Sequence, residues 1–445
     1  MLLTSKIHIT DTNKDEVSLD TLYNLCYHAA RLYNVGLYSV RQHYFATKEY
    51  LTYNSNFHEC KCNENYKLLL SDSSQQVLKM VDRDMQSFFR LLKLKNKGQY
   101  PSKIRLPRYK TKDTVMTLPI QGRSCRIQKD GTVCIGLTKE FRALYNVSIK
   151  KLTVTIPKNI RCVEQFNEMR IIPIYGGREF DIEFIYDTKY LDIPQVSEDA
   201  SGYLSIDLGV NNLMSCTVHS NSKPDAFIMD GRYVKNVNYY YNKKVSELRS
   251  AYSKNKSITD INTKRFRRLS NGRNNRINDY FNRTATHIVD YCLSNGIKNV
   301  VIGHNENQKQ NVAMGKVNNQ NFVSIPYYKL HAKLRSKCEL HGINFASIEE
   351  SYTSKASAVD LDYIPKYGDA DIPEFSGRRI KRGLYKMKDG RTINADINGS
   401  INILRKYIFA SKQNDLLSDC VRAFVNTPVR KVRPSCKAHR SLACG

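Results

Sequence analysis

Carboxylate side chains occur in three separated segments whose other residues are largely apolar or small. The acidic residues are Asp207, Glu349, Glu350 and Asp396, in the strings SIDLGVNN, SIEESYTS and INADING. Hydrolysis of a phosphodiester needs an activated water and a stabilised leaving oxygen, and two Mg²⁺ ions about 3.5–4 Å apart supply both. Mg²⁺ prefers a few carboxylates together with phosphate oxygens and water. The two aspartates and one glutamate are therefore the predicted catalytic residues and ligands of two Mg²⁺ ions.

Each carboxylate also has an ordinary structural interpretation. Asp396 stands where a helix is expected to begin and could cap that helix. Glu349 and Glu350 could be solvated surface charges, and Asp207 could have only a structural role. Asp207 is the least ordinary of the four, because a lone carboxylate in an apolar strand is costly unless it is paired or binds metal. The segments alone leave these alternatives open.

The charge of the chain indicates a polyanionic partner. Its 445 residues include 70 Lys and Arg against 42 Asp and Glu, a formal charge of +28. Each phosphate neutralised by Lys or Arg releases a counterion, so this excess favours nucleic acid binding. A basic RNA-binding protein without catalytic activity is an alternative, but it does not explain carboxylates at three strand or helix ends.

The sequence predicts an intracellular protein without a membrane partner. Its start lacks the apolar region of a secretory signal, and no stretch approaches the roughly 20 apolar residues of a membrane helix. A bacterial source would make it cytoplasmic and nucleoid-associated, with reduced thiols. Among twelve cysteines, Cys60 and Cys62 form the one close pair, and a C-x-C without a second pair is a weak metal signal.

The N-terminal half reads as a β-barrel interrupted by a helical lobe. Residues 3–10 alternate like a strand, and apolar residues from Leu19 onward recur at three- and four-residue steps, as in an amphipathic helix. Ser73 and Ser74 are expected to cap a second helix. Further β-branched runs are separated by turn residues and predict strands at 151–157, 170–175 and 181–187.

The C-terminal half alternates strands and helices in the order of an RNase H-like α/β domain. Three successive strands are expected at 203–210, 213–218 and 226–230. A long basic helix follows at about 264–293, and then a buried strand at 299–303. The remaining elements are a helix from Pro326 to about His341, a strand at 343–350 and a helix at 393–408. The basic tail ends in the segment VRKVRPSCKAHRSLACG (429–445), which is expected to be flexible.

Basic residues gather in three segments that we expect to contact nucleic acid. These are the loop at 93–112, the helix at 264–293 and the string FSGRRIKRGLY. Solvated charge runs are the alternative for each of them. The predicted nucleic-acid-binding residues are Arg105, Arg108, Lys110, Arg267, Arg268, Arg273, Arg276, Arg378, Arg379, Lys381 and Arg382.

Several long strings resemble the TnpB family, proteins of bacterial insertion sequences that are related to compact type V CRISPR nucleases and to Fanzors. The strings are SIDLGVNNL, VIGHNENQKQ, EESYTSKAS, DLDYIP, EFSGRRIKRGLY, INADINGSINILRK, SQQVLKMVDRDMQSFFRLLK and RLPRYK. They stand in the order expected of the family, and the resemblance as a whole covers about residues 5 to 410.

This resemblance implies an RNA-guided DNA endonuclease that cleaves double-stranded DNA next to a short adjacent motif. Its guide RNA would be transcribed from the end of a transposable element, and its RuvC-like domain would use an Asp, Glu, Asp triad. Whether it acts as a monomer or a dimer stays open. The implied domains are a wedge barrel (1–15 and 113–195), a recognition lobe (16–112), the nuclease domain (200–410) and the tail (411–445).

The chain departs from the family pattern at two places. The commonest position of the catalytic glutamate is occupied by Gly303, so we favour Glu350 as a relocated glutamate, with Glu349 as second choice. Residues 355–392 replace the family's zinc ribbon. No cysteine lies between Cys338 and Cys420, so no zinc site is expected there.

Two other functions remain possible from the sequence. A nuclease whose metal site has decayed would be an RNA-guided DNA-binding repressor, which Gly303 would favour and the retained aspartates disfavour. A conventional transposase would join strands without a guide, but the chain lacks an obvious recombinase motif.

Overall fold

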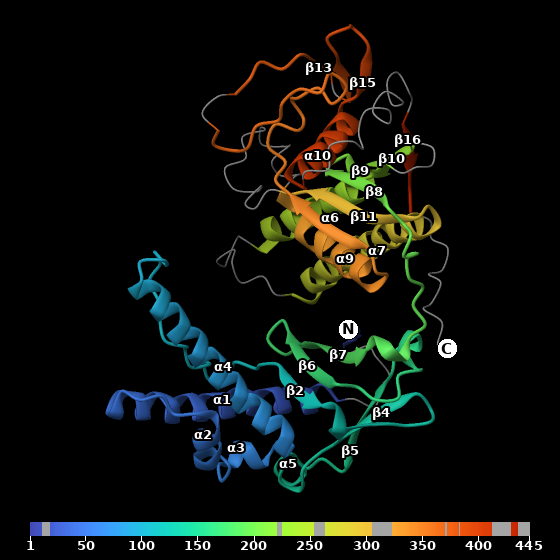
Figure 1. Cartoon of the computed structure of the whole chain (residues 1–445). Helices are drawn as coiled ribbons and strands as arrows, with labels where there is room; N and C mark the ends of the chain where they lie inside the picture. The colour runs from blue at the N-terminus through green and yellow to red at the C-terminus, as the bar shows by residue number, and fades with distance from the viewer. Residues whose placement is uncertain are drawn as a thin grey trace. The chain divides into compact units, whose positions relative to one another are not determined.

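A computed structural model of the chain describes residues 1–10, 18–219, 225–252, 263–304, 323–369, 372–381, 383–411 and 429–434, without the side chains of 409–411. The chain divides into two compact units, the first Met1–Asp192 and the second beginning at Ile193 (Figure 1). None of the helices in these ranges is long and apolar enough to cross a membrane.

The first unit combines a group of helices with two antiparallel sheets. The helices are α1 (Leu19–Thr47), α2 (Tyr53–Cys60), α3 (Glu64–Lys67), α4 (Ser71–Asn96) and α5 (Lys139–Tyr145). The strands are β1 (Leu2–Ile9), β2 (Leu118–Gln121), β3 (Cys125–Ile127), β4 (Thr132–Gly136), β5 (Lys151–Thr155), β6 (Glu168–Ile174) and β7 (Glu179–Asp187). They pair in the orders β1-β7-β6-β2 and β3-β4-β5. The strands are thus interrupted by helices as predicted, but one closed wedge barrel is not confirmed.

Helix α1 begins at Leu19, where its amphipathic pattern begins, and Ser18 Oγ accepts from the Thr21 N–H. The predicted capping of α4 by Ser73 and Ser74 is wrong. The helix already begins at Ser71, and Ser74 Oγ donates to the Tyr66 carbonyl at 2.9 Å inside the protein. Ser74 therefore joins α4 to the preceding chain instead of capping it.

The second unit is built on a six-stranded mixed sheet with the order β12-β11-β8-β9-β10-β16. The strands are β8 (Gly202–Leu208), β9 (Asn212–His219), β10 (Asp225–Asp230), β11 (Ile297–Gly303), β12 (Asn344–Ile348) and β16 (Arg430–Val432). Strands β8, β11 and β12 are parallel, and β9 is antiparallel to both of its neighbours. This is the arrangement expected of an RNase H-like α/β domain.

Helices cover both faces of this sheet (Figure 1). They are α6 (Arg232–Tyr252), α7 (Lys264–Ser294), α9 (Tyr327–Leu340) and α10 (Ala395–Ser411). Because successive strand residues face opposite sides, Leu204 and Ile206 enter the core with α7 and α9. Ser205 instead accepts a hydrogen bond from Ser400 of α10 through its carbonyl. Asp207 lies two residues after Ser205 in the strand, so it points to the same side of the sheet and faces α10.

The segment after α10 contains a strand that the sequence interpretation missed. β16 pairs in parallel with β10, with Ile228 beside Lys431. Two side chains reinforce this edge, since Arg433 Nε donates to Asp230 at 3.2 Å and Arg430 lies 3.3 Å from Asp225. The prediction of a uniformly flexible tail is therefore wrong for residues 430–432. Most of the tail lies outside the described residues.

Candidate metal-dependent nuclease centre

The predicted catalytic segments meet at one edge of the second unit's sheet. Ile206 of β8 pairs with Ile302 of β11, which places Asp207 beside Gly303 one residue further along. Gly303 in turn pairs with Ile348 of β12. These three strands are parallel, so their carboxyl ends share one edge, which is where α/β sheets commonly place functional groups.

Glu350 reaches the place where a side chain on Gly303 would project. A Cβ atom added at Gly303 would lie 2.9 Å from Glu350 Oε2 and 2.5 Å from Ile403 Cδ1. The missing side chain on β11 therefore leaves space that a carboxylate from the segment after β12 uses. Glu350 thus lies beside the position of the usual glutamate, and its catalytic role stays a prediction.

Glu349 is engaged elsewhere. The buried ammonium of Lys406 donates to Glu349 Oε2 at 2.7 Å, and it also donates to the Ser351 carbonyl. Burial alone would raise the pKa of Glu349, but the hydrogen bonds from Lys406 and Ser351 lower it below its ordinary value. Of the two adjacent glutamates, Glu350 is thus the one directed at Asp207 and Gly303, while Glu349 anchors α10.

Asp396 lies in the first turn of α10, but it does not cap the helix. Asn394 Oδ1 accepts from the N–H groups of Asp396 and Ile397 at 3.0 and 3.2 Å, so Asn394 performs the capping role. The carboxylate of Asp396 accepts from Asn212 Nδ2 at 2.6 Å and lies 3.3 Å from the Arg379 guanidinium. The capping interpretation of Asp396 is therefore wrong, and its oxygens point to the sheet edge.

Close packing of α10 brings Asp396 near Asp207. A Cβ atom at Gly399, one turn after Asp396, would lie 2.8 Å from Asp207 Oδ2. Burial and the neighbouring charges of Glu350 and Asp396 hold the pKa of Asp207 well above its usual range. Carboxylates crowded in this way need a counter-charge to be ionised together.

Tyr327 closes the other side of this edge. The tyrosine is 3% exposed and donates its hydroxyl to the Gly209 carbonyl at 3.0 Å, in the turn that follows Asp207. Burial, with the charges of Asp207 and Glu350, raises the pKa of this phenol. Tyr327 therefore stays a neutral donor that holds the turn in place.

The donors at this edge suit a hard divalent cation by their chemistry. Asp207, Glu350 and Asp396 offer carboxylate oxygens, and Asn212 Oδ1 is a buried acceptor without a partner among the described residues. Within these residues no three His, Cys, Asp or Glu side chains are already arranged to hold an ion. Binding of one cation by all three carboxylates therefore requires side-chain rearrangement. Asp396 is an example, because its oxygens already contact Asn212 and Arg379.

A polar network organises the segment that replaces the zinc ribbon. Arg405 is 1% exposed and donates to the carbonyls of Ser357 and Asp362 and to Asn402 Oδ1. Asn398 and Asn402 add hydrogen bonds to the Ala356 carbonyl at 2.8 and 2.7 Å. Side chains of α10 thus hold the loop that follows Glu350. This loop leads to a small sheet made of β13 (Arg378–Lys381), β14 (Leu384–Lys386) and β15 (Thr392–Asn394).

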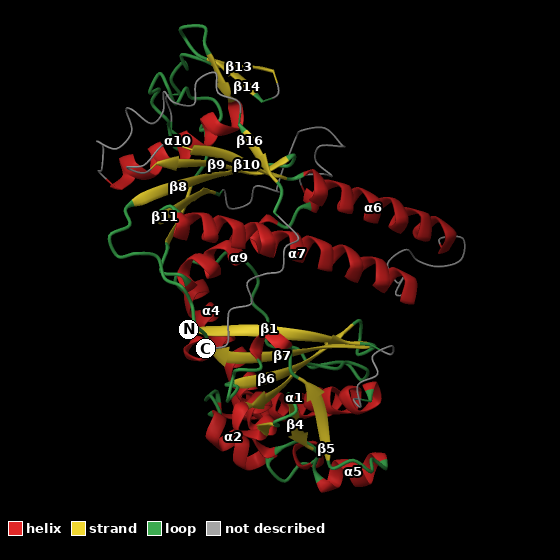
Figure 2. Ribbon diagram, turned by 90° about the vertical axis from the view of Figure 1, so that its right-hand side faces the viewer, coloured by secondary structure: helices red, strands yellow, loops and turns green. Residues whose placement is uncertain are grey.

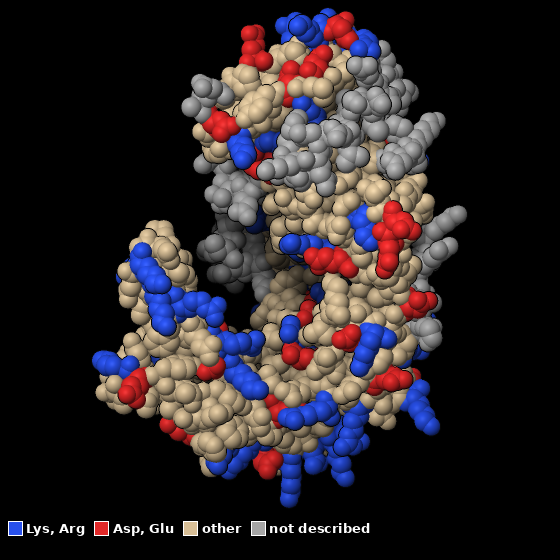
Figure 3. All heavy atoms as spheres, in the orientation of Figure 1, with Lys and Arg blue, Asp and Glu red and all other residues tan. Residues whose placement is uncertain are grey.

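The predicted basic residues of the first unit lie in a segment fixed to α1. The Lys110 backbone exchanges hydrogen bonds with the Asn34 amide at 2.7 and 2.8 Å, and its ammonium lies over the Tyr33 ring. Arg105 and Arg108 are exposed. Figure 3 shows more Lys and Arg side chains along α4; its exposed basic residues are Lys79, Arg83, Arg90, Lys93 and Lys95.

The predicted basic residues of the second unit differ in their surroundings. Arg268 and Arg276 on α7 are exposed, and Arg267 is partly buried. Arg273 Nε donates to Asn238 of α6 at 2.8 Å, and Nη2 to the Ser324 carbonyl, so this side chain joins elements of the protein. On β13, Arg378, Arg379 and Lys381 are exposed, while Arg382 lies outside the described residues. Nucleic acid contacts by these residues stay a prediction.

Three residues of the site were missed by the sequence interpretation. Asn212 had a usable signal, because it follows Asp207 closely and its amide is a natural partner for a carboxylate. Arg405 also had one, since it follows Asn398 and Asn402 at helical spacing within an apolar helix. Tyr327 had no distinguishing signal, because its role depends on the position of the turn at Gly209.

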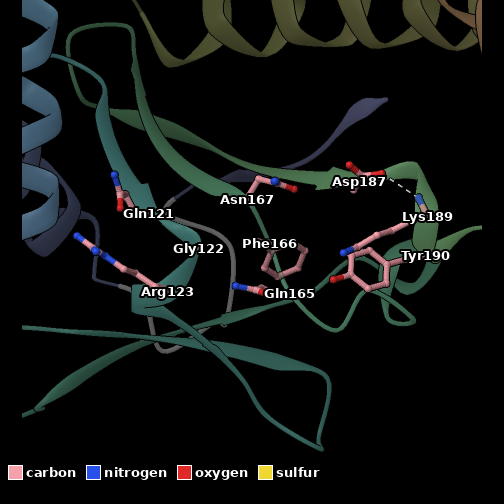
Figure 4. Close-up of a pocket in the computed structure, with 9 residues that line it drawn as sticks. All are labelled: Gln121, Gly122, Arg123, Gln165, Phe166, Asn167, Asp187, Lys189 and Tyr190. Atoms are coloured by element: carbon pink, nitrogen blue, oxygen red, sulfur yellow. Dashed lines mark hydrogen bonds between the residues drawn. The ribbon is translucent and has the colours of Figure 1, made fainter.

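A separate cavity of about 270 Å³ lies in the first unit (Figure 4). Asp187 accepts from the backbone N–H of Lys189 at 3.0 Å within it. Its lining residues are Gln121, Gly122, Arg123, Gln165, Phe166, Asn167, Asp187, Lys189 and Tyr190. Amides and cations dominate this lining and Asp187 is its single carboxylate, so the cavity does not duplicate the metal chemistry of the sheet edge.

Comparison with known proteins shows which family the chain resembles. Residues 188–309 match the family model OrfB_IS605, described as a probable transposase, and residues 327–403 match that of the Cas12f1-like TNB domain. The TnpB-like protein ORF457 of the Acidianus two-tailed virus is 23% identical over 428 residues, covering 85% of this chain and 82% of that protein. The chain is similar to TnpB-family proteins over most of its length. The resemblance predicted from its sequence strings is thereby confirmed.

The fold is shared with a compact Cas12 protein. The structure is similar to Cas12f1 in its cryo-EM complex with sgRNA and target DNA, with a TM-score of 0.53 and 16% sequence identity. The similarity covers 86% of this chain and 81% of that one. The structure therefore resembles the RuvC-containing α/β fold of the compact Cas12 nucleases.

Proposed function

We propose that this TnpB-like chain is an RNA-guided endonuclease that cleaves double-stranded DNA beside a short adjacent motif. The observation that carries the proposal is the position of Glu350, whose Oε2 atom uses the space opposite Gly303 at the edge that bears Asp207. With Asp396 on α10, this restores an Asp, Glu, Asp set although the usual glutamate position is a glycine. A decayed site would have no reason to direct another carboxylate to that place.

The charge of the chain and its relatives support the nucleic acid partners. A net charge of +28 suits an RNA guide and a DNA target held together in one basic channel. The Cas12f1 relative was solved with sgRNA and target DNA. We propose a guide RNA transcribed from the end of a transposable element and a site of action inside the cell.

The proposed chemistry is metal-assisted hydrolysis at the sheet edge. Two Mg²⁺ ions, when bound, would activate a water and stabilise the leaving oxygen. Asp207, Glu350 and Asp396 would hold them, and Asn212 would orient Asp396. Tyr327 keeps the turn after Asp207 in place through the Gly209 carbonyl. Arg379, 3.3 Å from Asp396, offers a cation to the phosphate of a bound strand.

The test is guided plasmid cleavage by the full chain purified with its own RNA. The copurified RNA is sequenced, and a supercoiled plasmid carrying the matching target is incubated with Mg²⁺ or with EDTA. The proposal predicts linear product with Mg²⁺ only, and none from Asp207→Ala protein that still binds the target. If the wild type binds the guided target but never cuts, the chain is an RNA-guided DNA-binding repressor. If the protein joins strands without RNA, it is a conventional transposase.

A further inference from the structure

Helix α6 leaves two adjacent tyrosines largely exposed close to the nuclease centre. Tyr239 is 68% exposed and Tyr240 is 51% exposed. The helix starts directly after β10, where the Gly231 N–H donates to the Asn211 carbonyl at 2.8 Å. Lys235 Nζ also donates to Asn211 Oδ1 at 3.4 Å. The beginning of α6 is thus joined to the turn that follows Asp207.

These tyrosines belong to two rows of residues on the outward face of α6. Residues four apart are neighbours on a helix surface and about 6 Å apart along its axis. One row is Lys235, Tyr239 and Lys243, and the other is Asn236, Tyr240 and Lys244. The opposite face is buried, through Val234, Val237, Asn238, Val245 and Leu248. Each tyrosine therefore has a lysine one turn further on.

An aromatic ring between lysines suits a single nucleic acid strand. The ring offers a stacking surface to any unpaired base, and the ammonium groups attract the phosphates between bases. A duplex hides the faces of its bases, so it could not use the rings in this way. Lys244 pairs with Glu247 at 2.7 Å, so Lys235 and Lys243, which flank Tyr239, are the ammonium groups that attract phosphate on this face.

Helix α7 adds positive charge beside these rows. Figure 2 shows α6 and α7 running side by side away from the strands, and Arg273 of α7 fastens them through Asn238 at 2.8 Å. Arg268 and Arg276 of α7 are exposed. The two helices are thus packed together, and the exposed arginines of α7 add positive charge to this part of the second unit.

We propose that the outward face of α6 binds single-stranded DNA by stacking bases on Tyr239 and Tyr240, and that it guides this strand to the carboxylate edge. The binding surface stands on its own contacts. The direction of the strand, toward Asp207, rests on the proposed nuclease function.

Binding is measured on the full-length protein by fluorescence anisotropy, with a fluorescein-labelled 20-nucleotide oligo(dT) in EDTA, so that no cleavage intervenes. The Tyr239→Ala/Tyr240→Ala variant should bind the probe more weakly by roughly 30-fold or more, from the typical contribution of one stacked base on each of the two rings. The Tyr239→Phe/Tyr240→Phe variant keeps the rings and should bind like the wild type. Tyr252→Ala is the matched control, because Tyr252 is exposed at the end of α6, about two turns beyond Lys244 and separated from it by the buried Leu248.

Crosslinking to the same oligonucleotide carrying 5-iodouracil gives a second measurement. It uses only the wild-type protein, so it does not depend on whether a variant folds. Peptides containing Tyr239 or Tyr240 should carry the crosslink. Unchanged binding by the double alanine variant, or crosslinks only elsewhere, would overturn the proposal. The proposal would also be overturned if the double alanine variant bound duplex DNA or RNA more weakly but bound the single-stranded DNA probe like the wild type. Since EDTA excludes catalysis, failure of the nuclease proposal would leave this binding result intact.

Discussion

Replacing Gly303 with alanine tests whether the empty position on β11 is what admits the carboxylate of Glu350. The added methyl group would lie 2.5 Å from Ile403 Cδ1 and 2.9 Å from Glu350 Oε2. Carbon atoms in proteins pack at about 3.5–4.0 Å, so one or both side chains must move by about 1 Å. Ile403 is fully buried, which leaves the Glu350 carboxylate as the group that can move more easily.

Two effects of different size follow. Overpacking of this kind costs about 1–3 kcal/mol, which corresponds to an apparent melting temperature lower by a few degrees for a unit of this size. Misplacement of a catalytic group by about 1 Å can reduce the rate on the order of 100-fold. We therefore expect Gly303→Ala protein to be folded but to cleave the guided target about 100-fold more slowly.

The assay compares initial rates of Mg²⁺-dependent guided cleavage, with thermal unfolding followed in parallel. Gly272→Ala is the matched control, because a Cβ atom there meets nothing within 4 Å, and the helix α7 should tolerate or prefer alanine. Wild-type cleavage by folded Gly303→Ala protein would refute the reasoning, since the carboxylate would then not need the space at position 303.

Two further predictions concern the frame around the site and the first unit. Arg405→Met should destabilise the second unit by roughly 3 kcal/mol or more, because three acceptors lose their donor at about 1–3 kcal/mol each. Thermal unfolding checks this, and Arg268→Met, at an exposed position of α7, is the control that should change stability little. The hydrogen bond with Asp181 raises the pKa of His8 despite the opposing effect of burial, so the stabilisation by His8 is complete below its unfolded pKa of about 6.5 and lost as the pH rises through the higher folded value. In urea unfolding, the free energy of unfolding of the wild type should exceed that of His8→Gln by at most ~1 kcal/mol near pH 5.5 and by less at pH 8.5. A difference in this free energy that grows with pH would contradict the assignment.

Much of the fold was predictable because its signals are local. The alternation of β8 and the long basic pattern of α7 each identify their element from a few consecutive residues, and the structure has them at Gly202–Leu208 and Lys264–Ser294. Strand β16 lacked such a signal. Its three residues become a strand only through pairing with β10, a contact between positions about 200 residues apart.

The roles of the acidic residues depended on contacts that no local pattern contains. Glu349 and Glu350 are neighbours after the same strand, and they differ in their contacts. Glu349 pairs with Lys406, whereas Glu350 lies beside Gly303. Asp396 looked equally suited to capping α10. Asn394 takes that role instead, and the Asp396 carboxylate accepts a hydrogen bond from Asn212. The choice was therefore made by tertiary packing around α10.

The most direct test of the central claim is the rate of guided, Mg²⁺-dependent cleavage by Glu350→Ala protein, measured beside Glu349→Ala. The relocated-glutamate centre predicts that Glu350→Ala loses cleavage by about 100-fold or more while it still binds the guided target. Glu349→Ala should keep a rate within a few-fold of the wild type, because Glu349 bonds to Lys406 and not to the catalytic edge. If Glu350→Ala cuts at the wild-type rate, Glu350 is not part of the centre and the account is wrong.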